Sequence, residues 1–466
     1  MTVDCDSLLS NPLSSSVRAE VRLNRSTAKY ENKSEKFRIS NREYNKQYCE
    51  TYSVRLDTIR KMIIPQAKKL HGEKIVVLPL SELREDTDAA REEDILIVGT
   101  LFKQQENKPS ILKEFSEDQI DKPEPEKEKY TAETDSLVLE DETMRVKLIG
   151  KVTPSLLVNG VVVGCWGREA SGGNFDVKEL IYPLIPSSDT QGEEVSICIL
   201  SGLNLNGTEG DWLESAQLAV DWICGSAGGL ADQEIASRVE RVILAGDCLA
   251  ESTRNKEDLT RARYLTLNKQ AGSVDAMRQL DDLLVQLAGS VNTDLLPGEN
   301  DPATGILPQQ PLHKCMFPQA SVFPTFQSVT NPYSCSVGGR EVLVLSGQSI
   351  GDIVKNSDLS NTIDILENLI KCGHVAPTCP DTLGCYPTYL EDPFVLQTLP
   401  DILVASNQAE YNFKKIVVNG KPILLLSVPQ FSSSRAVVQI SLHTLEPSII
   451  EFESQLEISN SPEPNK

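Results

Sequence analysis

Residues 241–250 read RVILAGDCLA, and this stretch decides the fold that we predict for most of the 466-residue chain. The run RVILA is typical of a buried strand, and a glycine and an aspartate follow where the strand ends. An apolar run followed by a polar turn recurs in CILSGLN (198–204), DLLPGEND (294–301) and LVASNQA (403–409). In α/β domains functional groups gather beyond the carboxyl ends of the strands, so these turns are the first places to look for chemistry.

Helical periodicity alternates with such strands over residues 191–446. Met277, Leu280, Leu284 and Leu287 recur at three- and four-residue steps, which predicts a helix over Val274–Ala288. Further helices are expected at Asp211–Cys224 and Asn361–Ile370, and strands at Val195–Ser201, Arg241–Gly246, Thr293–Pro297, Glu341–Gly347, Asp401–Ser406, Lys421–Gln430 and Ala436–Leu445. This alternation indicates a layered α/β sandwich.

Residues 41–190 follow a different pattern. One apolar stripe predicts a helix over residues 41–70, formed by Tyr44, Tyr48, Tyr52, Leu56, Ile59, Ile63 and Ile64. Short strands are expected at Asp94–Lys103, Leu137–Val152, Leu156–Trp166 and Asn174–Tyr182, with an acidic loop at 114–135 and a hairpin turn at 171–173. A helix followed by several short strands favours the small closed barrel of an OB-fold. The whole chain is therefore predicted to be α+β and multidomain, with a disordered N-terminus at 1–40 and a disordered acidic tail at 447–466.

The formal net charge of −22 limits the function classes. Binding to a nucleic-acid backbone needs a surface rich in Lys and Arg, so little direct DNA binding is expected, and a single-strand binder is the weaker alternative. We find no apolar run long enough to span a membrane and no basic signal-peptide region at the N-terminus. The 11 cysteines include no CxxC pair, which favours reduced thiols in the cytosol or nucleus.

The polar turns at the strand ends resemble the signature of calcineurin-like metallophosphoesterases. Active members carry Asp-x-His, Gly-Asp-x-x-Asp, Gly-Asn-His-Asp/Glu and Gly-His-x-His there, because a two-metal centre needs carboxylates and imidazoles. In this chain the positions corresponding to the metal ligands are Gly202, Asn204, Asp247, Ala250, Asn300, Asn407 and Ala409. Only Asp247 keeps a ligand group.

The histidines support the same interpretation. His71, His313, His374 and His443 lie at none of these ligand positions, although His374 is near the place of a further ligand in active relatives. We therefore expect an inactive phosphoesterase domain with no catalytic residue, no cofactor and no bound metal. A weakly active metallophosphoesterase, or residual binding of one metal at Asp247, stays open as an alternative.

A barrel followed by a degenerate phosphoesterase domain resembles the B-type accessory subunits of eukaryotic replicative DNA polymerases. Two strings are specific signals for the delta polymerase, namely LPQQPLH at 307–313 and PDTLGCYP at 380–387. The resemblance implies a nuclear, non-catalytic scaffold that bridges the C-terminal metal-binding domain of the catalytic subunit and a third accessory subunit. It also implies roles in lagging-strand synthesis and repair, and service to the translesion polymerase zeta. The equivalent subunit of polymerase alpha or epsilon is the alternative, and the partner-binding residues are left unknown.

Overall fold

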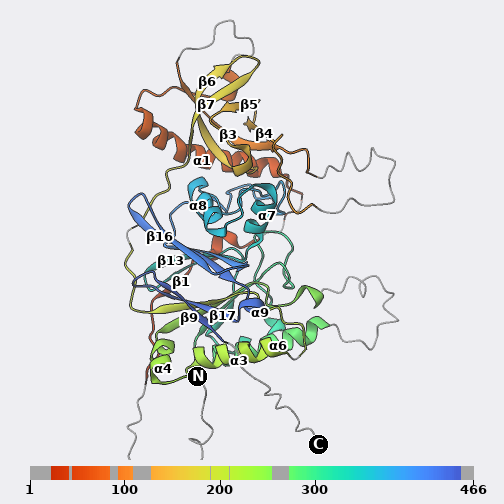
Figure 1. Ribbon diagram of the computed structural model, residues 1–466, viewed down its shortest axis with the longest axis vertical. Coiled ribbons are helices and arrows are strands. Elements are labelled where there is room, and N and C mark those ends of the chain that lie inside the picture. Colours follow the sequence, from red (N-terminus) through yellow and green to blue (C-terminus); the bar gives the residue numbers. More distant parts are fainter. Residues whose placement is uncertain are drawn as a thin grey trace, which may run out of the picture.

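The computed structural model describes residues 23–40, 43, 45–83, 93–108, 127–188, 190–208, 210–253 and 272–452. The molecule is elongated, with a small barrel at one end and the helices α3, α4 and α6 at the other (Figure 1). None of the helices in these ranges has both the length and the apolar character that a bilayer span requires.

The barrel is a closed five-stranded sheet. Its strands are β3 (Ile95–Gln104), β4 (Ser136–Glu140), β5 (Arg145–Gly150), β6 (Val162–Ala170) and β7 (Asn174–Ile181). They pair in the order β3-β4-β5-β7-β6, and β6 returns to pair with β3, which closes the barrel. The short β2 (Val77–Leu78) adds an edge to β3. The OB-fold prediction is confirmed, although β6 begins later than expected because Pro154–Leu156 forms a 3-10 turn.

Helix α1 (Tyr48–His71) packs against the outside of this barrel. Leu56, Ile59 and Ile63 are buried, and they form one apolar cluster with Leu96 and Val162 of the barrel strands. The predicted stripe is thus confirmed at its centre. Its start is wrong, because the helix begins at Tyr48 and the Tyr48 side chain is 41% exposed.

The remaining chain forms a sandwich of two six-stranded sheets. One sheet has the order β11 (Phe326–Ser328), β10 (Asn292–Leu296), β9 (Val239–Ala245), β8 (Ser196–Leu200), β17 (Ala436–Ser441) and β18 (Pro447–Glu451). The other has the order β1 (Tyr30–Asn32), β12 (Tyr333–Val337), β13 (Arg340–Leu345), β14 (Ile402–Gln408), β16 (Lys421–Pro429) and β15 (Asn412–Val418). Between them lies a core of aliphatic side chains from both sheets.

Helices cover the outer faces of both sheets. Helices α3 (Asp211–Cys224), α4 (Leu230–Ser237) and α6 (Gly272–Ala288) lie on the β8–β11 side, and α7 (Gln348–Asn356) and α8 (Thr362–Cys372) lie on the other side, toward the barrel (Figure 1). The short α9 (Phe431–Ser434) follows β16. The prediction of an α/β sandwich is confirmed.

Both predictions of terminal disorder are wrong for the residues that the structure describes. In the N-terminal segment, β1 pairs with β12, and Phe37 is 1% exposed. At the other end, β18 pairs with β17 over residues 447–451. The three residues of β1 carry no local periodicity, and their partner β12 lies far away in the sequence, whereas β18 forms a hairpin with the preceding strand β17. Residues 1–22 and 453–466 lie outside the described residues.

The predicted acidic loop at 114–135 is described only from residue 127 onward. Its last part is held in place, because the buried Asp135 lies 3.3 Å from Lys103 of β3, which is also buried. The amide of Tyr130 donates a 2.8 Å hydrogen bond to the carbonyl of Lys355 in α7. Residues 127–135 therefore connect the barrel to the sandwich.

Candidate functional site

The structure brings most of the predicted strand-end positions together. β8, β9 and β10 are adjacent and parallel, so the turns that follow them meet at one edge. The backbone amide of Asn300 donates to Asp247 Oδ1 at 2.8 Å, and the backbone amide of Asn204 donates to the backbone carbonyl of Asp247 at 3.0 Å. Ala250 takes part only through its backbone, whose amide bonds to the Leu205 carbonyl at 2.9 Å.

The backbone at these turns has an unusual shape. Asn204, Asp247 and Asn407 have φ values of +50°, +50° and +59°, and Gly202 has a φ of +62°. Most L-residues avoid this left-handed region, but Asn, Asp and Gly tolerate it. This explains why the four positions carry these residue types, whatever chemistry takes place there.

The space at the centre is filled by protein groups. The side-chain amide of Asn407 donates through Nδ2 to the backbone carbonyls of Ser346 at 2.8 Å and Ala245 at 3.1 Å. A Cβ added at Gly202 would lie 2.8 Å from Gln430 and 2.9 Å from Asn407 Oδ1, so a larger side chain does not fit there. Ala409 is exposed and has no ligand group.

Asp247 and Asp301, two of the acids at this edge, accept hydrogen bonds from backbone amides of the turns. Asp301 is 1% exposed and accepts hydrogen bonds from the amides of Gly298 at 2.7 Å and Leu249 at 3.0 Å. Burial raises the pKa of Asp301 to about 7, in spite of these two donors. No group of three or more His, Cys, Asp or Glu side chains within the described ranges could hold a metal ion. The residues present do not fit a two-metal centre.

His374 takes part in a buried ionic cluster between the barrel helix and the sandwich. Its Nε2 lies 3.0 Å from Asp392 Oδ2, and the same oxygen accepts from Arg55 Nε of α1 at 2.6 Å. Burial, together with the Arg55 charge, lowers the pKa of His374 to about 4. Although burial opposes its ionisation, Arg55 and His374 hold the pKa of Asp392 below its usual range. Both nitrogens of His374 have protein partners, since Nδ1 accepts from the Ala376 amide at 3.1 Å.

One of the two specific strings forms the surface on which α1 docks. Tyr48 Oη donates to the Cys385 carbonyl at 2.8 Å, and Tyr52 Oη donates to Asp381. Just beyond the string, the Thr388 carbonyl accepts from Thr51 Oγ1 at 2.6 Å. These contacts connect residues more than 300 positions apart in the sequence.

The other string supports the strand-end turns. The Gln309 side chain donates to the Gly298 carbonyl at 2.9 Å and accepts from Asn331 Nδ2 at 2.7 Å. Both strings therefore have structural roles, one at the contact between the domains and one below the strand-end site.

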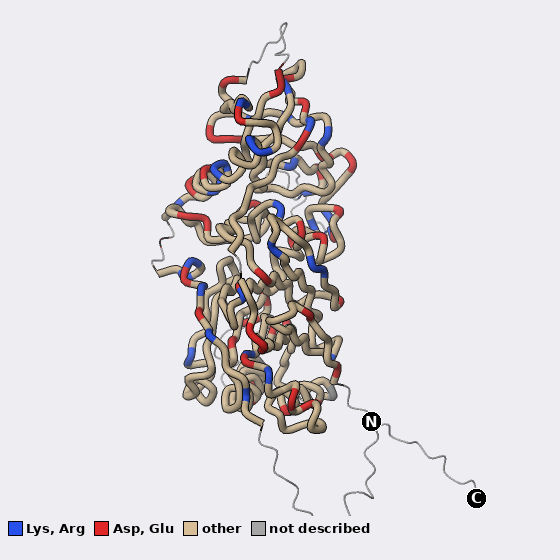
Figure 2. Tube along the Cα trace, turned by 90° about the vertical axis from the view of Figure 1, so that its left-hand side faces the viewer, with Lys and Arg blue, Asp and Glu red and all other residues tan. Residues whose placement is uncertain are grey.

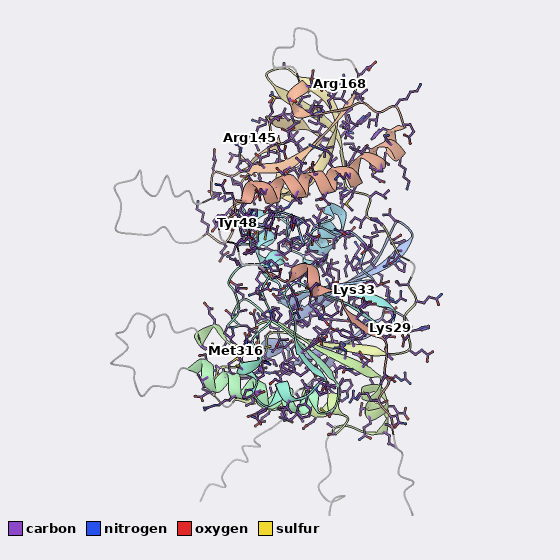
Figure 3. All side chains as sticks on the ribbon, turned by 180° about the vertical axis from the view of Figure 1, so that it is seen from behind. Lys29, Lys33, Tyr48, Arg145, Arg168 and Met316 are labelled. Atoms are coloured by element: carbon purple, nitrogen blue, oxygen red, sulfur yellow. The ribbon has the colours of Figure 1, made fainter. Side chains whose placement is uncertain are left out.

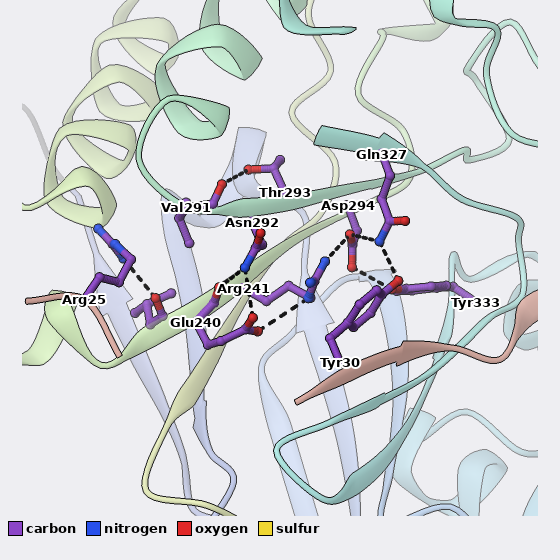
Figure 4. A network of polar contacts seen from close by, with 11 residues as sticks. Arg25, Tyr30, Glu240, Arg241, Val291, Asn292, Thr293, Asp294, Gln327 and Tyr333 are labelled. Carbon is purple, nitrogen blue, oxygen red and sulfur yellow. Dashed lines mark hydrogen bonds and ion pairs between the residues drawn. The ribbon is translucent and has the colours of Figure 1, made fainter. Parts of the chain in front are cut away.

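The structure contains a second buried polar network, which was not predicted from the sequence. Arg241 Nη1 lies 2.7 Å from Asp294 Oδ1, and Tyr333 Oη donates to Asp294 Oδ2 at 2.6 Å (Figure 4). Tyr30 of β1 lies under the Arg241 guanidinium, 3.6 Å from ring centroid to Cζ. Nearby, Arg25 donates to the carbonyl of Ile223 at 2.7 Å. The sequence signal for this network was a charged residue in each of two otherwise apolar strands, Arg241 in β9 and Asp294 in β10.

Two arginines on the outer surface of the barrel are paired with carboxylates. Arg145 and Arg168 project from it (Figure 3), and each faces a carboxylate, Glu140 at 2.8 Å and Asp94 at 3.6 Å. Trp166 is stacked with His71 at 4.0 Å between ring centroids. Acidic and basic residues are interspersed along the chain trace (Figure 2).

Comparisons with known proteins give two family matches. The family of OB-fold domains of DNA polymerase delta subunits matches residues 47–180, and the family of B-type subunits of DNA polymerases alpha and epsilon matches residues 197–414. Among solved structures, an archaeal phosphodiesterase covers 55% of this chain and 99% of its own, with 13% identity and a TM-score of 0.29, a likeness too slight to support an argument.

Several curated relatives match nearly end to end. The DNA polymerase delta subunit 2 of Drosophila melanogaster is 36% identical over 437 residues, which cover 92% of this chain and 98% of the relative. The delta small subunit of Arabidopsis thaliana is 34% identical, with coverages of 93% and 97%, and that of Saccharomyces cerevisiae is 30% identical, with coverages of 91% and 93%. The chain therefore belongs to the family of DNA polymerase delta small subunits.

Proposed function

We propose that this chain is a non-catalytic scaffold of DNA polymerase delta that acts in the nucleus. It binds the C-terminal metal-binding domain of the catalytic subunit and a third accessory subunit, and so holds the enzyme together for lagging-strand synthesis and repair. The same surfaces would serve polymerase zeta in translesion synthesis. Membership of the delta small-subunit family supports the assignment to this polymerase.

The non-catalytic role is inferred from the groups that fill the strand-end site. Its centre is occupied by the side-chain amide of Asn407, which donates to two backbone carbonyls. The backbone at Gly202 lies so close to its neighbours that no larger side chain fits there. Asp247 is the one carboxylate left among the predicted metal positions, and its Oδ1 already accepts a hydrogen bond from the backbone amide of Asn300. Metal-assisted hydrolysis needs a bound ion and an activated water, and one carboxylate supplies neither the geometry nor the affinity.

The scaffold role is also supported by how the two domains are joined. The Arg55–Asp392 pair is fully buried at the contact between α1 and the sandwich, and two hydroxyl-to-carbonyl bonds, from Tyr48 and Thr51, join the same parts of the chain. Breaking a buried pair of this kind is costly, so the barrel and the sandwich present one continuous surface to partners. The net charge of −22 favours contact with DNA through those partners rather than directly.

The test is reconstitution of the polymerase from its purified subunits. At about 0.3 M salt, where weak surface charge contacts are screened, the full chain should form a stoichiometric complex with the catalytic subunit and increase primer extension. An Asp247→Asn variant, which loses the last ligand charge but keeps the side-chain shape, should assemble and support synthesis like the wild type.

Two results would contradict the proposal. One is a chain that binds neither polymerase subunit. The other is hydrolysis of a phosphodiester with manganese that the Asp247→Asn variant abolishes, because this would mean that the strand-end site is catalytic.

A further inference from the structure

A groove with a cavity volume of about 260 Å³ lies where the barrel and the sandwich meet. Its walls come from α1, β7 and the segment that follows it, α8, and the turn between β15 and β16. Most of the lining side chains are apolar, including Leu70, Leu180, Pro183, Ile185 and Ile370. Leu70 is 51% exposed, so apolar surface at the mouth of the groove is open to a partner.

The floor of the groove is fixed from both sides. The amide of Leu184 donates to the Met62 carbonyl of α1 at 3.1 Å, and Asn419 Nδ2 donates to the Ile185 carbonyl at 3.0 Å. The groove is therefore formed before any partner arrives, which lowers the entropic cost of binding.

Its polar groups have unmet bonding capacity. Gln66 lines the groove, and its Oε1 is buried but accepts no hydrogen bond from the part of the chain that the structure describes. Lys371, at the rim, lies over the Tyr182 ring at 4.4 Å. Lys69 is exposed and shares a helix face with Gln66, three residues away. Neither lysine forms a salt bridge with a described carboxylate, in a chain whose net charge is −22.

We propose that this groove binds a short peptide segment of another polymerase subunit that carries acidic residues beside one or two apolar anchors. The anchors fill the groove, and the acidic side chains pair with Lys371 and Lys69. The volume is below the range of about 300–1,000 Å³ for drug-sized ligands, so side chains fit better than a cofactor. This inference rests on the proposed function, because it takes the partner from within the polymerase.

The test places a photo-crosslinking residue, p-benzoylphenylalanine, at Leu70 of the full chain in the reconstituted complex. The expected crosslink is to a segment of the catalytic or the third subunit in which Asp or Glu flanks apolar residues. A crosslink to a basic segment, to a second copy of this chain, or to no protein at all would overturn the inference.

Charge-reversal variants measure how much the two lysines contribute to binding of the partner. The double variant Lys69→Glu, Lys371→Glu should weaken binding of one purified subunit at least tenfold. Lys61→Glu, at an equally exposed lysine more than two turns away on α1, should change the dissociation constant less than twofold. The apolar counterpart is Leu70→Asp, with Leu230→Asp on α4 as its control, since Leu230 is 60% exposed.

The outcomes separate the two proposals. If the wild-type chain binds its polymerase partners and the groove variants bind equally well, the groove inference is wrong and the scaffold function stands. If the wild-type chain binds neither subunit, the scaffold function itself is wrong, and this inference falls with it.

Discussion

One buried histidine, His374, should contribute a loss of stability as the pH falls. His374 accepts the Ala376 amide at Nδ1 and lies 3.0 Å from Asp392 at Nε2, so the neutral ring carries its proton on Nε2. A second proton would have to enter at Nδ1, facing an N–H donor, in a site that is 1% exposed and close to Arg55. The pKa of His374 is accordingly lowered from 6.5 to about 4.

The sign follows from the lowered pKa. Between the folded and unfolded pKa values the unfolded chain binds more protons, so the free energy of unfolding falls as the pH decreases through this window. With values of 6.5 and about 4, acidification from about pH 7 to about pH 5 should cost about 2 kcal/mol from this residue alone. Below about pH 4 both states are protonated and the penalty stops growing.

The assay compares urea unfolding of the full chain at the two pH values with that of a His374→Gln variant. Glutamine can accept from Ala376 and donate to Asp392 but does not titrate, so the variant should lose about 2 kcal/mol less than the wild type. A His313→Gln variant, altered at an exposed histidine, keeps His374 and should behave like the wild type. Equal losses in the wild type and His374→Gln, or an NMR titration of the His374 ring above about pH 6, would refute the reasoning.

Three further changes test other parts of the structure by urea unfolding. Arg55→Met leaves the Asp392 carboxylate buried without its arginine partner, and should cost about 3–5 kcal/mol, whereas Arg60→Met on the same helix breaks a partly exposed pair and should cost less than about 1 kcal/mol. A loss below about 1 kcal/mol for Arg55→Met would contradict the role of the buried pair. Gly202→Asp restores an acid where no space exists, so it should destabilise by about 1–3 kcal/mol and produce no phosphodiesterase activity with manganese, and a stable, active variant would contradict the fit argument. Arg25→Ala removes three bonds to backbone carbonyls and should cost about 1.5–3 kcal/mol, while a neutral result would show that these three bonds contribute no net stability.

The sequence alone determined most of the secondary structure and the architecture. The stripe of Met277, Leu280, Leu284 and Leu287 has a helical period, so α6 could be predicted. The run RVILA is short, rich in β-branched residues and followed by a glycine, so β9 could be predicted as well. That Gly202 and Ala250 have no metal-binding group was equally readable, because it depends on residue type alone.

Only the tertiary structure decided which distant residues meet. Nothing local in Tyr30–Asn32 indicates a strand, since it is held by hydrogen bonds to β12, a strand far away in the sequence. The clusters at His374 and Arg241, like the groove beside α1, join side chains from distant parts of the chain. Periodicity reports only how one segment divides its faces between core and solvent, whereas the partner of a buried charge depends on how the segments pack in three dimensions.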